Sequence, residues 1–458
     1  MENKSIEMAR RVARAVNAAG GRTFFVGGCV RDALMGRQIK DVDIEVHGIA
    51  PAALESILDG LGERVTMGAS FGVMSLRHYD LDVAMPRSER ATGRGHRDFA
   101  VFVDPFLGPE KAARRRDFTM NALMRDALTG ELLDFFGGRE DLKRGVLRHV
   151  DDDTFAEDPL RAFRAAQFAA RFGFSVAPET VALCARMDAS ALAGERVMGE
   201  LEKALLKAER PSVFFEELRE MRQLSAWFPE LEALIGVPQR AFFHPEGDAW
   251  AHTLQVLDGA AAARERAEHP LWLLLAALCH DFGKAAAPIG EDGNARGHEN
   301  AGLPLARAFL ARLTTETRLT EYALNMTALH MIPNTLAYHG AETLAFMEAF
   351  DRSVCPEDLI LLCRADYTGR VGPEGSREAL EAAYAPTEAL LRGMLATYRE
   401  RMARPCVMGR DLVAAGVAPG PLMGEALDCA HALRLAGEPK EKQLARALEL
   451  IRRKEERP

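Results

Sequence analysis

The strongest constraint in this sequence is a change of periodicity near residue 140. Before it, short stretches show the apolar patterns of β-strands, at residues 24–26, 42–46, 71–85 and 99–103. From about residue 155 to the end, apolar residues recur at helical spacing. This distribution predicts the α+β fold class, with a small mixed sheet first and helices in the rest of the chain.

The length of 458 residues allows roughly two to four domains. Gly and Pro cluster near Pro211, within residues 236–247 and within residues 369–375, and such clusters favour breaks between helices. We therefore predict four parts: a head over residues 1–140, a helical neck over 141–240, a second helical domain over 241–370 and a helical tail over 371–458.

The composition excludes several classes of protein. With 48% hydrophobic and 27% charged residues the chain is neither fibrous nor disordered, and its longest apolar run, residues 271–279, is about half a membrane span. Seven scattered cysteines without a Cys-x-x-Cys pair indicate neither a disulfide framework nor a thiolate zinc site. The first 16 residues are charged instead of forming an apolar signal core, so we expect a cytoplasmic protein.

The net charge of −9 argues against a polyanionic ligand, but the charge is unevenly distributed. Residues 1–150 carry 23 Lys and Arg against 21 Asp and Glu, a balance of +2, which leaves −11 for the remainder. A phosphate-bearing ligand is therefore more compatible with the N-terminal part.

Two aspartates beside a glycine turn form the most informative segment. The strand at residues 24–26 is followed by Gly27 and Gly28, where backbone amides can approach an anion closely. In the next strand, a period of two places Asp41 and Asp43 on one face. Aspartate disfavours strands, so a bound cation would explain the pair; a solvated edge strand is the alternative.

A third aspartate, Asp82, lies in another alternating strand that could pair beside the first. Three carboxylates could then hold two Mg²⁺ ions about 3.5–4 Å apart, the arrangement used for in-line nucleotidyl transfer. A surface position without a ligand is an equally good reading of Asp82.

Four segments in chain order resemble the motifs of class II tRNA nucleotidyltransferases, the CCA-adding enzymes and their bacterial poly(A) polymerase relatives. They are residues 27–43, 115–123, 157–164 and 195–201. The resemblance implies a Mg²⁺-dependent nucleotidyltransferase head with Asp41, Asp43 and Asp82 as catalytic residues, a neck that selects the nucleotide and binds RNA, and tRNA, CTP and ATP as partners. The nucleotide-binding residues that it implies are Gly28, Arg31, Arg115, Arg116, Asp117, Asn121, Asp158, Arg161 and Arg164.

Asp158 and Arg161 also have a physical interpretation of their own. Cytosine and adenine each present an amino donor beside a ring-nitrogen acceptor, whereas uracil and guanine present a carbonyl beside a ring N–H. With i, i+3 spacing on one helical face, Asp158 could accept from the amino group and Arg161 could donate to the ring nitrogen of cytosine or adenine. Uracil or guanine would leave both protein groups facing like partners, which is costly. The alternatives are a surface ion pair, or Asp158 as the cap of a helix that begins at Pro159.

An Arg-rich segment, residues 87–97, precedes the second motif and includes Arg87, Arg90, Arg94 and Arg97. Arginine suits bidentate phosphate contacts, so the segment could bind triphosphate or RNA, or could be a solvated loop. In the family a flexible loop here accompanies the switch from C to A addition, which mildly disfavours an enzyme that adds only C.

The helical half contains a second candidate site. His280 and Asp281 end an apolar stretch, where burying two polar side chains is costly unless they bind a ligand or a hydrogen-bond partner. Together with His252 and Asp366 they resemble the HD phosphohydrolase superfamily, which implies a divalent metal of unspecified identity and phosphodiesterase, nucleotidase or phosphatase activity. His298, Glu299 and His330 are further candidates for a phosphate or a second metal, or are surface residues.

The combination resembles bacterial CCA-adding enzymes that carry an HD domain, and it predicts template-independent addition of C and A nucleotides to the 3′ end of tRNA. A poly(A) polymerase or an A-adding enzyme on the same fold is one alternative. A metal-dependent phosphohydrolase whose head only binds nucleotide, and a non-catalytic RNA-binding protein, are others.

Overall fold

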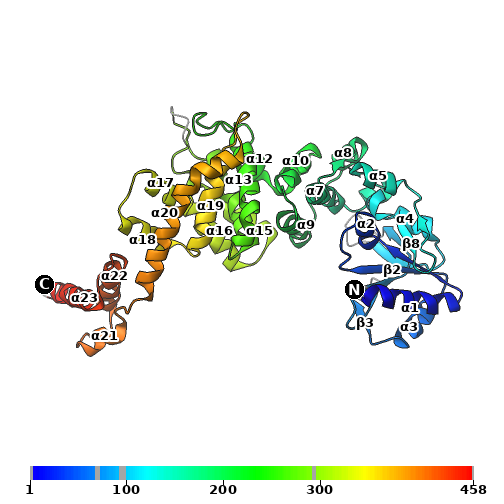
Figure 1. Ribbon diagram of the computed structural model, residues 1–458, viewed down its shortest axis with the longest axis horizontal. Coiled ribbons are helices and arrows are strands. Elements are labelled where there is room, and N and C mark those ends of the chain that lie inside the picture. Colours follow the sequence, from blue (N-terminus) through cyan, green and yellow to red (C-terminus); the bar gives the residue numbers. More distant parts are fainter. Residues whose placement is uncertain (1–3, 68–72, 92–98, 291–294, 456–458) are drawn as a thin grey trace. The chain divides into compact units, whose positions relative to one another are not determined.

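The computed structural model describes residues 4–67, 73–91, 99–290 and 295–455 (Figure 1). They form two compact units. Unit 1 comprises Met1–Ala208 and Val213–Trp227, and unit 2 comprises Glu209–Ser212 and Phe228–Pro458. The boundary lies within the predicted neck, most of which therefore belongs to the same compact unit as the head.

Unit 1 contains a seven-stranded sheet in the order β3-β4-β5-β2-β1-β8-β9. Its strands are β1 (Arg22–Val26), β2 (Val42–His47), β3 (Arg64–Met67), β4 (Val73–Leu76), β5 (Leu81–Ala84), β8 (Met124–Asp126) and β9 (Leu132–Leu133). Strands β2 and β5 run parallel, and the other neighbours are antiparallel. The predicted mixed sheet in the first 140 residues is confirmed.

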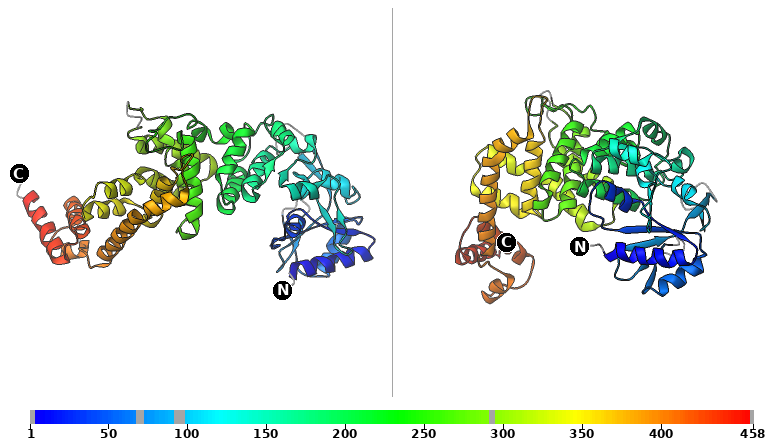
Figure 2. Two further views of the ribbon diagram at one scale, coloured as in Figure 1. Left: turned by 45° about the horizontal axis from the view of Figure 1, so that its top comes forward. Right: turned by 45° about the vertical axis from the view of Figure 1, so that its right-hand side comes forward.

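Helices α1 (Lys4–Ala18) and α3 (Pro51–Asp59) cover one face of this sheet (Figure 2). Val12 of α1 and Leu54 of α3 belong to the same buried cluster as Val42 and Ile44 of β2. Because side chains alternate along a strand, the burial of Val42 and Ile44 against these helices leaves Asp43 on the opposite face. The apolar core thus fixes the direction of the aspartate.

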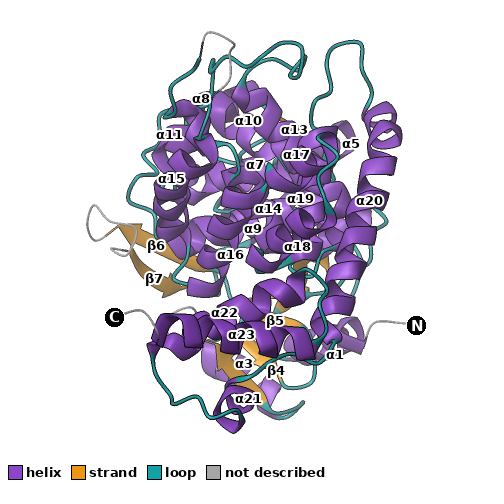
Figure 3. Cartoon of the chain, turned by 90° about the vertical axis from the view of Figure 1, so that its left-hand side faces the viewer, coloured by secondary structure: helices purple, strands orange, loops and turns teal. Residues whose placement is uncertain are grey.

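Strands β6 (Arg87–Ala91) and β7 (Phe99–Val103) form a separate antiparallel hairpin (Figure 3). Arg94 and Arg97 of the predicted Arg-rich loop lie outside the described residues.

The rest of unit 1 is helical, apart from a two-residue parallel pair between β10 (Val146–Leu147) and β11 (Ser175–Val176). Its further α-helices are α2 (Gly28–Leu34), α4 (Pro109–Arg114), α5 (Gly138–Arg144), α6 (Asp152–Ala156), α7 (Leu160–Phe172), α8 (Pro178–Cys184), α9 (Gly194–Lys207), α10 (Ser212–Glu220) and α11 (Leu224–Trp227). Helix α7 packs along α9, and this contact determines where the third and fourth motifs meet.

Unit 2 is a helical bundle (Figure 1). Its main helices are α13 (Ala249–Ala263), α14 (Pro270–Cys279), α15 (His298–Leu313), α16 (Thr317–Leu329), α19 (Pro356–Thr368) and α20 (Arg377–Ala403). Residues 273–279 of α14 are all buried, which accounts for the uniformly apolar sequence of this segment. Helix α13 packs on α14 and α19, and α14 packs on α16, so the residues that follow α14 lie inside the bundle.

The C-terminal helices α21 (Gly409–Ala414), α22 (Pro421–Leu435) and α23 (Lys440–Glu455) enclose a small core of their own (Figure 2). None of the described helices has the length and apolar content that a membrane span requires.

Candidate functional site

The head aspartates lie where two parallel strands meet. Asp43 of β2 and Asp82 of β5 are direct neighbours in the strand register, and Ser75 Oγ donates a 2.6 Å hydrogen bond to Asp82 Oδ1. Asp41 is exposed and immediately precedes β2. Burial and the negative charge of Asp82 raise the pKa of Asp43. A divalent cation would relieve this repulsion between carboxylates, so the residues fit one.

A glycine turn places Arg116 beside these aspartates. Gly27 adopts a φ of +66°, and a Cβ there would lie 3.2 Å from Arg116 Nη1 and 3.9 Å from Asp43 Oδ2. Glu45, also on β2, accepts a hydrogen bond from Arg116 Nη2 at 3.3 Å. Gly28 begins α2 directly after the turn. Glu45 is buried, and it was not predicted as a site residue from the sequence. Strand alternation places Glu45 on the same face as Asp43, but it does not reveal the contact with Arg116.

The second motif forms a buried polar network. Arg31 Nη1 donates to Asn121 Oδ1 at 2.8 Å, and Asn121 Nδ2 donates to Asp117 Oδ1 at 3.0 Å. Arg164 of α7 donates to Asp117 Oδ2 through Nε at 2.8 Å and through Nη2 at 2.6 Å. Burial alone would raise the pKa of Asp117, but the charge of Arg164 and the hydrogen bond from Asn121 lower it. The network ties α2 and the segment around Asp117 to the neck helix α7.

Replacing Asp117 by Asn should therefore destabilise unit 1. The variant leaves Arg164 without its main counter-charge, and we expect a loss of about 2–4 kcal/mol in the free energy of unfolding at pH 7, less than for a fully buried pair because Arg164 is partly exposed. Because the pKa of Asp117 is lowered in the folded state, this difference should shrink below about pH 4. Urea unfolding of both proteins at pH 7 and pH 3.5 measures it; an equal difference at both pH values would contradict the assignment.

A cavity of about 440 Å³ opens beside this network within unit 1. Its lining includes the arginines Arg87, Arg115, Arg116, Arg161, Arg164 and Arg196 and the acids Glu45, Asp117 and Asp158. Such an excess of guanidinium groups favours an anionic ligand with several phosphates. Arg196 belongs to the fourth motif but was not among the predicted nucleotide-binding residues.

Asp158 and Arg161 both line this cavity, yet each already has partners in the protein. Asp158 Oδ2 accepts from Arg196 Nη2 at 2.8 Å, and Asp158 Oδ1 accepts from the backbone N–H of Leu160 at 3.2 Å. Arg161 donates to the backbone carbonyls of Thr154 and Arg115 at 2.7 and 2.8 Å. Helix α7 begins at Leu160 with Pro159 at its N-cap position, one residue later than the capping alternative assumed, although Asp158 does accept from its first backbone N–H. These partners hold both side chains at the cavity wall.

The HD residues come together in the interior of unit 2. His252, His280, Asp281 and Asp366 are all buried, and so are His298 and His330, for which a surface position was the alternative. Glu299 is intermediate in exposure and lies 3.7 Å from His298 Nδ1. Four imidazoles and two carboxylates in one core require a cation or protons to balance them.

The hydrogen bonds of three histidines fix which ring nitrogen faces the cluster. The Nδ1 atoms of His280, His298 and His330 donate to the carbonyls of Ala277, Ala295 and Thr327 at 2.7, 2.8 and 2.7 Å. Each neutral ring therefore presents a lone pair on Nε2. Among the described residues, His280 Nε2 is buried without a hydrogen-bond partner, as expected of a metal ligand.

Asp281 joins two groups of potential ligands. Its Oδ2 lies 3.1 Å from His280 Nε2 and 3.5 Å from His252 Nε2, and its Oδ1 lies 3.1 Å from His298 Nε2 and 3.8 Å from His330 Nε2. The ligand atoms of each group lie within 4.8 Å of one another. Burial alone would raise the pKa of Asp281, but its interactions with His280 and the charge of Lys284 hold it well below its usual value. This donor set fits a divalent transition metal.

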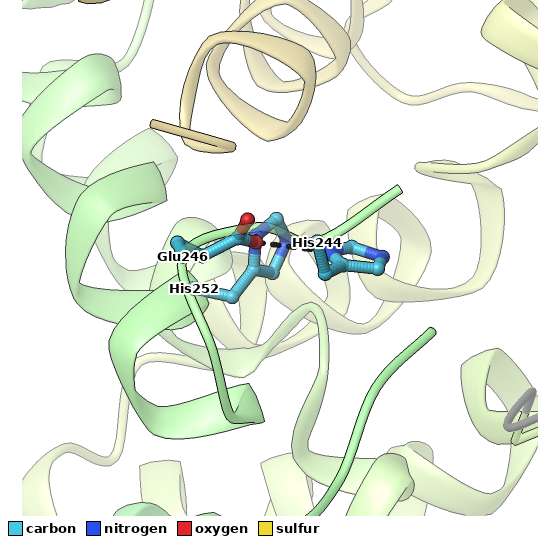
Figure 4. A group of neighbouring side chains, drawn as sticks. All are labelled: His244, Glu246 and His252. Atoms are coloured by element: carbon cyan, nitrogen blue, oxygen red, sulfur yellow. Dashed lines mark hydrogen bonds and ion pairs between the residues drawn. The ribbon is translucent and has the colours of Figure 1, made fainter. Parts of the chain in front are cut away.

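Two residues that sequence reasoning missed complete the cluster (Figure 4). Glu246 Oε1 accepts from His244 Nδ1 at 2.8 Å and from His252 Nδ1 at 2.7 Å, while His252 Nε2 lies 3.1 Å from Asp366 Oδ1. The sequence offered only a weak signal for them, a His-Pro-Glu segment within the Gly and Pro cluster that was interpreted as a break.

A cavity of about 360 Å³ reaches this cluster. It is lined by His244, Asp281, His298, His330 and Asp366 and by four cationic side chains, Arg240, Lys284, Arg296 and Arg370. Lys284 Nζ lies 2.5 Å from Asp281 Oδ2. Positively charged side chains beside a group of potential metal ligands favour a ligand that carries phosphate.

Three family profiles match the chain. Residues 23–148 match the poly A polymerase head domain, residues 173–235 match the "Probable RNA and SrmB-binding site of polymerase A", and residues 249–370 match the HD domain.

Curated relatives match most of the chain. The multifunctional CCA protein of Chromobacterium violaceum is 39% identical over 81% of this chain and 92% of the relative, and that of Xanthomonas oryzae is 39% identical over 89% and 96%. Among solved structures, the fold is similar to the Bacillus stearothermophilus CCA-adding enzyme in complex with CTP (TM-score 0.68, 23% identity, 99% of both chains). It is also similar to the Thermotoga maritima CCA-adding enzyme complexed with tRNA (TM-score 0.62, 19% identity, 98% of this chain and 96% of that one).

Proposed function

The chain belongs to the multifunctional CCA protein family, and we propose that unit 1 adds C and A nucleotides to the 3′ end of tRNA from CTP and ATP. The observation that carries this proposal is the arginine-lined cavity of unit 1. Arg116 lines it, and so does Ala84, the last residue of β5, two positions after Asp82. The cavity has the volume and charge for a nucleoside triphosphate. The four predicted parts remain our proposed domain division.

In this reaction the tRNA 3′-hydroxyl oxygen forms a bond to the α-phosphorus. The bond between the α-phosphorus and the oxygen that bridges to the β-phosphate breaks, and pyrophosphate leaves. Asp41, Asp43 and Asp82 would hold Mg²⁺, which when bound activates the hydroxyl and stabilises the leaving oxygen. Arg115 and Arg116 would bind the triphosphate. Asp117 and Asn121, fixed by Arg31 and Arg164, would position the ribose side of the nucleotide.

We propose that Asp158 and Arg161 read the base edge, and Arg161→Ala tests this. We expect kcat/KM for CTP and ATP to fall about 10–100-fold, because one charge-assisted hydrogen bond to the base is lost, while UTP and GTP gain relative to them. Steady-state kinetics with all four nucleotides measure the ratio, and thermal unfolding shows whether losing the bonds to Thr154 and Arg115 has loosened the neck. Unchanged rejection of UTP and GTP would contradict the assignment.

The proposed activity is tested with tRNA transcripts that end before, within and after the CCA sequence. Addition of C, C and A in order, followed by arrest, is the expected result. Continued A addition would instead identify a poly(A) polymerase, and addition of A only to transcripts that end in CC would identify an A-adding enzyme.

The histidine and aspartate cluster of unit 2 favours a second activity. We propose that it holds a divalent metal and hydrolyses phosphate esters. His252, His280, Asp281 and Asp366 would be the ligands, with His298 and His330 as further donors, and the bound metal would lower the pKa of an attacking water. Lys284 and the arginines of the cavity would bind the phosphate.

A further inference from the structure

Glu246 of unit 2 forms a bridge between two histidines, His244 and His252 (Figure 4). The side chains of Glu246 and His252 are inaccessible to solvent, while that of His244 is 15% exposed and faces the cavity. The two imidazoles stand almost perpendicular, at 84°, with centroids 4.7 Å apart. One carboxylate oxygen therefore sets the orientation of both rings.

The direction of these hydrogen bonds follows from the geometry. Glu246 Oε1 lies 2.8 Å from His244 Nδ1 and 2.7 Å from His252 Nδ1, and a carboxylate oxygen placed between two ring nitrogens satisfies both contacts by accepting from each. Both Nδ1 atoms are then donors. His252 consequently presents Nε2 to Asp281 and Asp366, and His244 lines the cavity while its Nδ1 is held by Glu246.

We propose that Glu246 is a positioning residue, which orients His252 for metal binding and His244 for contact with the substrate phosphate. The inference rests on the proposed metal-dependent function of unit 2. When a histidine binds a metal through one ring nitrogen, a carboxylate that accepts from the other ring nitrogen fixes the tautomer of the histidine and increases its basicity. Loss of the carboxylate typically weakens metal binding about 10–100-fold.

Two substitutions of Glu246 separate its charge from its hydrogen bonds. Glu246→Gln keeps an acceptor oxygen but removes the charge, and Glu246→Leu has similar volume but removes both. In titrations of the metal-free full chain with Co²⁺, we expect affinity to fall about 10-fold for Gln and about 100-fold for Leu. The signal assigned to the cluster is the one that Asp281→Asn abolishes. Glu230→Gln is the matched control, since Glu230 is a buried carboxylate of unit 2 that pairs with Arg312.

His244→Asn tests the second role. Asparagine can keep a donor near Glu246 while removing Nε2, so Co²⁺ affinity should stay within twofold of wild type and KM for p-nitrophenyl phosphate should rise about 10-fold. Wild-type Co²⁺ affinity in both Glu246 variants would overturn the positioning role, and an unchanged KM in His244→Asn would overturn the substrate contact. If wild type shows no Co²⁺ signal that depends on Asp281, the proposed metal function itself fails, which is a distinct result.

Discussion

Asp43→Asn should reduce nucleotide addition to tRNA by roughly 10³-fold or more, because it removes a charged ligand from the proposed Mg²⁺ site at the position where transition-state charge develops. The effect should appear in kcat, with little change in the affinity for CTP, since the arginines of the cavity remain. Single-turnover incorporation of labelled CTP into tRNA lacking its 3′ end measures it.

Loss of folding would not explain that result. The pKa of Asp43 is raised in the folded state, so without Mg²⁺ its charge destabilises the protein increasingly as the pH rises above the unfolded value of 3.8. The Asn variant lacks this penalty and should melt at or above the wild-type temperature at pH 7. Near-normal incorporation by the double variant of Asp41 and Asp43 would refute the assigned metal ligands.

The sheet and the position of the head aspartates followed from alternation in the sequence. Val42 and Ile44 are apolar because they pack on α1 and α3, and that same packing determines the face of Asp43. The pairing of β5 beside β2 was also predicted from the alternation around Asp82, whereas its parallel direction was not.

Other parts of the sites depend on contacts that no local pattern encodes. Arg196 reaches Asp158 across 38 residues, and only the packing of α7 on α9 brings them together. His252 and Asp366 are 114 residues apart. Glu246 is close to His252 in sequence, but its role depends on a turn that buries its side chain, and a Gly and Pro cluster does not predict that burial.

Asp281→Asn should abolish the proposed phosphohydrolysis, with a fall of roughly 10³-fold or more in metal-dependent release of phosphate from p-nitrophenyl phosphate. Asp281 belongs both to the group with His252 and His280 and to the group with His298 and His330, so its loss removes a potential ligand from each. The isosteric amide removes the charge that balances Lys284. The metal-free variant should therefore be less stable than wild type, and added Co²⁺ should no longer raise its melting temperature.

The two aspartate variants together distinguish one bifunctional enzyme from a phosphohydrolase whose head only binds nucleotide. If both sites are catalytic, Asp43→Asn retains phosphate release and loses tRNA extension, and Asp281→Asn shows the reverse. A phosphohydrolase with a binding head would extend no tRNA in either protein or in wild type. Phosphate release that persists in Asp281→Asn would place hydrolysis outside the cluster, because in the described part of unit 2 Asp281 is the one carboxylate that lies near all four histidines.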